Sequence, residues 1–135
     1  MAQATVGGMV VAIDGAAGSG KSTLARGLAI ATGLPYVNTG SMYRAVTLAA
    51  IIKGVDQDDA QGVADLMRTL RFTLEDGPPK ELWIDGGPPT AAFTNPEVEA
   101  AVSRIARHPE LRALMRQAQR SLGSQGAIME GRDIA

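Results

Sequence analysis

Residues Gly15–Ser22 follow the pattern G-x-x-x-x-G-K-[ST], which is typical of a loop that wraps the phosphates of ATP or GTP. The run Val10–Ile13 just before it is short, apolar and rich in β-branched residues, as expected for a strand buried on both faces. Gly33 stands where a following helix would end. Between them, the apolar residues that recur at helical spacing are Leu24, Leu28 and Ala31. The order of strand, glycine loop and helix predicts an α/β domain of the P-loop NTPase class, with a parallel sheet flanked by helices.

The loop chemistry assigns roles to individual residues. Glycines let the backbone approach phosphate oxygens closely, and successive N–H groups at a helix N-terminus attract anions. Lys21 can reach the β- and γ-phosphates, the Ser22 hydroxyl can ligate Mg²⁺, and Asp14 is a candidate for the magnesium water shell. The simpler alternatives are a glycine-rich turn and, for Asp14, a solvated acid at a strand end. The residues predicted to bind the phosphates are Gly15, Ala16, Ala17, Gly18, Ser19, Gly20, Lys21, Ser22 and Thr23.

Size and composition exclude several classes of protein. At 135 residues the chain has the size of one domain. It contains no cysteine, which excludes a disulfide framework and a thiolate metal site. Its net charge of −1 argues against a general nucleic-acid-binding protein. We find neither an apolar run long enough to span a bilayer nor a secretory signal, and therefore expect a cytoplasmic protein that binds neither membranes nor nucleic acids.

The next part of the chain continues the strand and helix alternation. Residues Leu34–Asn38 read as a second strand, and Asp56–Leu70 as a helix with an acidic start. Between them lies a helix that Gly54 ends, with an apolar face of Met42, Ala45, Val46 and Ala49.

Residues 70–93 follow a different pattern. Arg71–Leu74 and Leu82–Ile84 alternate and are separated by turn residues, which predicts an antiparallel hairpin. A third short strand is predicted at Ala91–Phe93. We interpret this segment as a small antiparallel insert.

Helical patterns return after the insert. A helix is predicted to begin at Asn95 and Pro96, and a second to run from Pro109 to Leu122. A buried strand is expected at Ala127–Met129.

Polar residues follow three of the predicted strands: Asp14, Asn38–Gly40 and Glu130–Asp133. Ligands of open parallel sheets bind beyond the carboxyl ends of the strands, so we expect these residues, Thr39 among them, to line one cleft. Arg44 is predicted in the first turn of a helix, where the macrodipole disfavours a cation. A bound phosphate would account for it, with Arg132 as a second cation; a solvated arginine is the alternative.

Taken together, five motifs resemble bacterial cytidylate kinase in order and spacing, and they cover essentially the whole chain. They are Gly15–Thr23, Asn38–Arg44, Glu97–Val98 with Ala101–Ser103, His108–Arg112 and Gly131–Asp133.

The resemblance implies transfer of phosphate from ATP to CMP and dCMP with Mg²⁺, giving CDP and dCDP in pyrimidine nucleotide metabolism. Lys21, Arg44 and Arg132 would be the catalytic residues, the two arginines holding the acceptor phosphate. The implied cytosine-binding residues are Ser103, Arg112 and Asp133, and the implied nucleotide-binding insert is 70–93. The chemistry agrees, since a carboxylate accepts from the cytosine amino group and a guanidinium donates to the ring acceptors.

Members of that family continue well beyond the Gly131–Asp133 motif, into a basic segment that closes over ATP. We therefore expect residues 1–135 to form a partial cytidylate kinase-like domain, truncated at its C-terminus. Because closing segments contribute strongly to phosphoryl transfer, one rival is a catalytically impaired nucleotide-binding fragment. We expect a monomer unless a second chain completes it. Another rival is a different P-loop kinase, for example one acting on uridine or adenylate.

Overall fold

The computed structural model describes residues 9–14 and 20–131. Its elements, in chain order, are β1 (Val10–Ile13), α1 (Lys21–Thr32), β2 (Tyr36–Asn38), α2 (Thr39–Lys53), α3 (Ala60–Thr69), β3 (Phe72–Glu75), β4 (Glu81–Ile84), the 3₁₀ helix η1 (Ala91–Thr94), α4 (Pro96–Ile105), α5 (Pro109–Leu122) and β5 (Ala127–Glu130). The predicted α/β class is confirmed.

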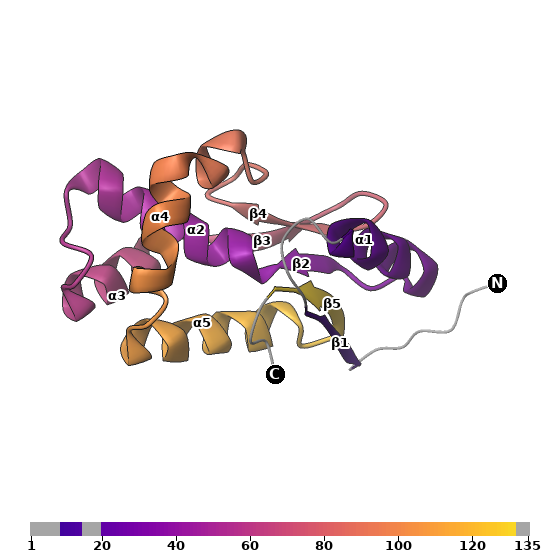
Figure 1. Cartoon of the computed structure of the whole chain (residues 1–135). Helices are drawn as coiled ribbons and strands as arrows, with labels where there is room; N and C mark the ends of the chain where they lie inside the picture. The colour runs from indigo at the N-terminus through magenta and orange to yellow at the C-terminus, as the bar shows by residue number, and fades with distance from the viewer. Residues whose placement is uncertain (1–8, 15–19, 132–135) are drawn as a thin grey trace.

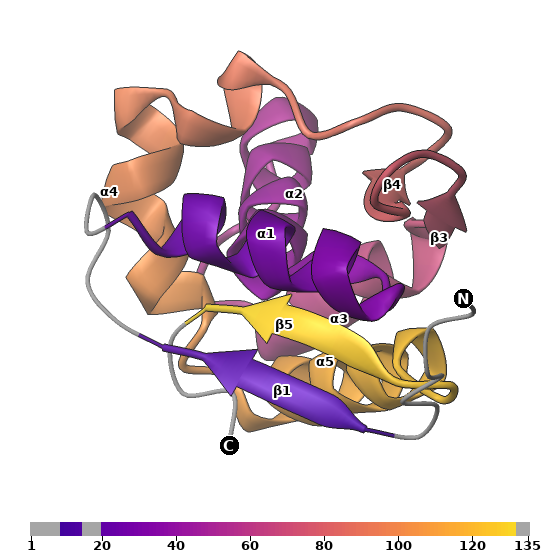
Figure 2. The ribbon, with the colours of Figure 1, turned by 90° about the vertical axis from the view of Figure 1, so that its right-hand side faces the viewer.

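A five-stranded sheet with the order β1-β5-β2-β4-β3 organises the domain (Figure 1). Strands β1, β5, β2 and β4 pair in parallel, and only β3 runs antiparallel to its neighbour. Helices α1 and α5 cover opposite faces of the sheet (Figure 2). Because β5 lies between β1 and β2, the carboxyl ends of three parallel strands meet at one edge of the sheet.

Strand β5 separates two apolar clusters because its side chains alternate between the faces of the sheet. Ile128 packs with Ala25 and Ala29 of α1. Ala127 and Met129 face the larger cluster, which α2, α3 and α5 complete. All of β5 is buried, as predicted for its residues 127–129.

Strand β1 and helix α1 depart from the predicted burial. Positions along β1 alternate between exposed and half-buried, because this strand lies at the edge of the sheet, so the prediction of burial on both faces is wrong. In α1 the buried residues are Ala25 and Ala29, whereas Leu24 is 56% exposed. Ala31 is also exposed. Of the predicted apolar face only Leu28 packs against the core.

The predicted hairpin is confirmed as β3 and β4, and its place in the sheet is a new finding. Strand β4 pairs in parallel with β2, so the hairpin extends the main sheet. The third predicted strand, 91–93, is wrong, because these residues form η1. This short 3₁₀ turn leads directly to Asn95, the cap of α4.

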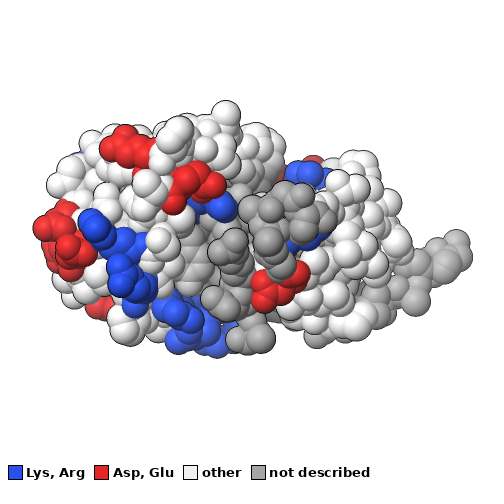
Figure 3. Space-filling model, viewed as in Figure 1, with Lys and Arg blue, Asp and Glu red and all other residues white. Residues whose placement is uncertain are grey.

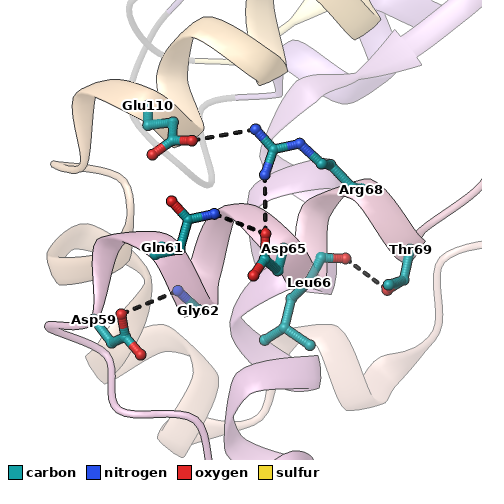
Figure 4. A network of polar contacts seen from close by, with 8 residues as sticks. All are labelled: Asp59, Gln61, Gly62, Asp65, Leu66, Arg68, Thr69 and Glu110. Carbon is teal, nitrogen blue, oxygen red and sulfur yellow. Dashed lines mark hydrogen bonds and ion pairs between the residues drawn. The ribbon is translucent and has the colours of Figure 1, made fainter.

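Helix α3 is fixed at its start and along its side (Figure 4). The Asp59 side chain accepts a hydrogen bond from Gly62 N at 3.0 Å and caps the helix. Arg68 contacts Asp65 at 3.0 Å and Glu110 of α5 at 3.2 Å, which ties α3 to α5. Among the described residues, no helix combines the length and apolar character that crossing a membrane requires.

Candidate nucleotide site

A cavity of about 790 Å³ lies at the edge where the parallel strands end. It is lined by Gly20, Lys21, Ser22, Thr23, Asn38, Thr39, Gly40, Tyr43, Arg44, Glu99, Val102, Ser103, Ala106, Arg107, Arg112, Glu130 and Gly131. These residues come from the start of α1, the ends of β2 and β5, the first half of α2, and the adjoining parts of α4 and α5. The predicted convergence of the β2 and β5 strand ends on one cleft is therefore observed.

The structure brings together the predicted site residues that it describes, with one exception. Lys21, Ser22, Thr39, Arg44 and Arg112 all line the cavity, as do Gly20, Thr23 and Ser103. Asp14 is exposed at the end of β1 and is not among the lining residues. Gly15–Ser19, Arg132 and Asp133 lie outside the described residues.

Glu130 lines the cavity, as predicted, but the sequence did not identify the residues that contact its carboxylate. It is 5% exposed, and Ser22 Oγ lies 2.9 and 3.0 Å from its two carboxylate oxygens. The Tyr36 hydroxyl donates to the same carboxylate, and Thr39 Oγ1 donates to the Glu130 carbonyl at 2.9 Å. The signal in the sequence was an acidic residue directly after an apolar run. Its hydrogen-bond partners could not be identified in this way, because they lie far away in the sequence.

Beside Glu130, three further polar side chains join these elements: Tyr36 of β2, Arg26 of α1 and Glu81 of β4. Burial, and then the hydrogen bond to Glu130, raise the pKa of Tyr36 above its usual value. The Arg26 guanidinium lies 5.0 Å from the centre of the Tyr36 ring and contacts Glu81 at 3.1 Å. The hydrogen bond to Glu81 raises the pKa of Arg26, so this arginine stays charged beside the ring.

Arg44 lines the cavity from α2. Helix α2 begins at Thr39, with Asn38 as its cap, so Arg44 lies in the second turn and not in the predicted first turn. Its side chain nevertheless reaches the first turn, because helical side chains lean toward the N-terminus. A Cβ at Gly40 would lie 2.6 Å from Arg44 Nη1, which shows how closely the guanidinium lies against the backbone there. Arg44 Nε donates to Glu99 of α4 at 2.7 Å.

The end of the cavity formed by α4 and α5 carries Ser103, Arg107 and Arg112. Pro109 starts α5 directly after His108, so Arg112 lies in the first turn of that helix. Figure 3 shows basic side chains gathered over α4 and α5 on the face seen in Figure 1. Cations therefore line both ends of the cavity, which suits a ligand with phosphate groups.

Residues 11–135 match the family model of cytidylate kinase. The chain belongs to the cytidylate kinase family. A cytidylate kinase of Limosilactobacillus fermentum is 42% identical over 130 residues, which cover 96% of this chain and 58% of the relative. One of Pelotomaculum thermopropionicum is 44% identical over 127 residues, 92% of this chain and 56% of the relative.

The same family domain also occurs fused to another enzyme. A bifunctional pantoate ligase/cytidylate kinase of Synechococcus is 42% identical over 130 residues, covering 93% of this chain and 24% of the relative. The chain thus spans a little over half of the length of the cytidylate kinases it matches and a quarter of the fused protein.

Proposed function

We propose that this chain binds ATP and CMP or dCMP for the transfer of the ATP γ-phosphate, giving ADP and CDP or dCDP in pyrimidine nucleotide metabolism. The observation that carries the proposal is that one cavity is lined by Lys21, Arg44 and Arg112, which come from three different helices. A monomer acting in the cytoplasm is part of the same proposal.

The donor phosphates would be held at the start of α1. Backbone N–H groups there point toward an anion, and Lys21 adds a positive charge. The loop residues Gly15–Thr23 complete this site in the proposal.

The magnesium ion would be held by oxygen ligands beside this site. Ser22 and Glu130 offer a hydroxyl and a carboxylate in contact with each other. Oxygen donors of this kind suit Mg²⁺, which keeps several water and phosphate ligands. When bound, the ion would neutralise charge on the transferring phosphate. Asp14, at the end of β1, would act through the water shell.

The acceptor would lie toward α2, α4 and α5. Arg44, together with Arg132, would bind the CMP phosphate, with Thr39 nearby at the end of β2. Ser103, Arg112 and Asp133 would bind the cytosine. No protein base is needed, because the acceptor phosphate is itself an anionic nucleophile. The insert 70–93 would be a nucleotide-binding segment, although the described lining of this cavity includes none of its residues.

Two measurements test the proposal: calorimetric binding of ATP, CMP, UMP and AMP, and a coupled assay of ADP release on the same 135-residue chain. We expect CMP to bind most tightly. Arg112→Ala should reduce the preference for CMP over UMP about tenfold or more, as expected for loss of charge-assisted hydrogen bonds, whereas Arg116→Ala on the same helix should not. Lys21→Ala is the blank for turnover.

Each outcome has a defined meaning. Preferential binding of AMP or UMP would replace the proposal with another nucleotide kinase. Binding of CMP and ATP without turnover above the Lys21→Ala blank would assign binding alone to this chain. No nucleotide binding by the folded protein would overturn the proposal.

A further inference from the structure

Glu99 places a carboxylate in a cavity proposed to bind anions. Its Oε1 atom accepts a hydrogen bond from Arg44 Nε at 2.7 Å, and both residues line the cavity. Arg44 belongs to α2 and Glu99 to the first turn of α4. A negative charge here would repel a phosphate, so the presence of Glu99 requires a physical explanation.

The nitrogen atom that Glu99 engages is informative. A guanidinium carries five N–H groups, and its end-on pair, Nη1 and Nη2, matches two oxygens of a phosphate. Glu99 takes only Nε, and no other residue in the described part of the chain accepts a hydrogen bond from Arg44. Nη1 lies against Gly40, where a side chain would collide with it. The contact with Glu99 thus fixes the guanidinium while leaving its end-on pair available.

The Arg44–Glu99 ion pair is expected to contribute little to the stability of the fold. The Arg44 side chain is 25% exposed and that of Glu99 46%, and exposed ion pairs contribute little to folding. Its larger effect concerns binding. A long arginine side chain loses rotamer freedom when it binds a ligand, and a partner that already restrains it reduces that loss.

We infer that Glu99 is a positioning residue, which holds Arg44 by Nε so that Nη1 and Nη2 receive the phosphate of the acceptor nucleotide. The inference rests on the proposed function, because it takes Arg44 as the ligand of that phosphate. It adds a residue that the motif pattern did not identify and gives its carboxylate a specific task.

The test is calorimetric binding of CMP and of cytidine to the wild-type chain and three variants. Glu99→Ala removes the hydrogen bond and the charge, whereas Glu99→Gln removes the charge but keeps an acceptor oxygen. Glu97→Ala is the matched control, since Glu97 lies in the same exposed turn of α4 and outside this cavity. We expect Glu99→Ala to raise the Kd for CMP about three- to tenfold, as loss of a preorganised side chain would, and to leave cytidine binding unchanged.

Glu99→Gln should retain at least about half of the wild-type affinity for CMP, because it keeps the contact with Nε. Glu97→Ala should bind CMP as the wild type does. CMP binding by Glu99→Ala that equals or exceeds that of the wild type would overturn the inference, as would an equal loss of CMP and cytidine binding. In either case the proposed function stands, because the wild type binds CMP. Wild-type protein that binds neither ligand would instead overturn the proposed function, and the inference with it.

Discussion

Glu130, in the candidate site, accepts hydrogen bonds from three side chains, those of Ser22, Tyr36 and Thr39. A carboxylate that is 5% exposed loses most of its contact with water, and this is tolerable only when hydrogen-bond donors replace the water. Ser22 from α1 and Tyr36 from β2 supply those donors. Glu130, Ser22 and Tyr36 therefore join the start of α1 to two neighbouring strands, and two of them, Ser22 and Glu130, line the cavity itself.

Tyr36 should ionise later than an ordinary tyrosine. Burial and the hydrogen bond to Glu130 raise its pKa above the usual 10.0, so the folded protein keeps this proton at a pH where the unfolded chain has released it. Stability from this group is therefore complete below about pH 10 and declines as the pH rises further. An absorbance titration of the native protein should therefore show the phenolate transition of Tyr36 delayed relative to that of an ordinary tyrosine.

Tyr36→Phe should remove that delayed transition and flatten the decline in unfolding free energy above about pH 10. Tyr43→Phe is the control and should retain both effects. A delayed transition that persists in Tyr36→Phe would contradict the assignment.

At the scale of elements, side-chain caps explain where three helices begin. Asn38, Asp59 and Asn95 each accept a hydrogen bond from the backbone N–H three residues later, at 3.2, 3.0 and 2.9 Å. Each thereby satisfies an N–H group that the helix itself leaves without a partner. The cap at Asn38 also sets the orientation of Arg44, because it determines where α2 begins.

Asn95→Ala should destabilise the protein by about 1 kcal/mol, the usual cost of removing a side-chain cap. The measurement is the free energy of unfolding in urea. Asn95→Asp keeps an acceptor oxygen and should stay close to the wild type. Equal losses in both variants would show that the side chain acts through some contact other than the cap.

Elements with local signals could be predicted from the sequence, and those that depend on distant partners could not. The glycine that ends α2 at Gly54, in the left-handed region with φ of 68°, and the Asn95 cap are encoded within one turn of chain. The buried face of α1 is not. Apolar residues lie all round this helix, so periodicity cannot select one stripe, and the small Ala25 and Ala29 pack on the sheet while Ile30 stays 59% exposed.

The site shows the same division. Thr39 and Arg44 could be located from a strand end and a helix start that adjoin in sequence. The contacts of Ser22 with Glu130 and of Arg44 with Glu99 join residues far apart in the chain, and no local pattern encodes such a pair.

At the scale of the whole molecule, the hairpin is continuous with the sheet that carries the candidate site. Strand β4 pairs with β2, and the Arg26–Glu81 ion pair joins it to α1. The hairpin is therefore an extension of the main sheet.

This continuity predicts one cooperative unfolding transition. Trp83, the only tryptophan, lies on β4 and reports on the hairpin, whereas far-ultraviolet circular dichroism is dominated by the helices. The two signals should give coincident urea transitions. A Trp83 fluorescence transition at lower urea than the dichroism transition would mean that the hairpin unfolds by itself.

Strand β5 comes last among the described strands, yet it occupies the position between β1 and β2. Among the described strands β1 pairs only with β5, so β1 can join this sheet only after β5, far later in the sequence, has been made. Pairing between two strands so far apart in the sequence forms slowly, because a long loop must be ordered first. During synthesis, none of the described strands can therefore pair with β1 until residues 127–130 have emerged, and until then the unpaired edge of β1 can bind chaperones or another nascent chain.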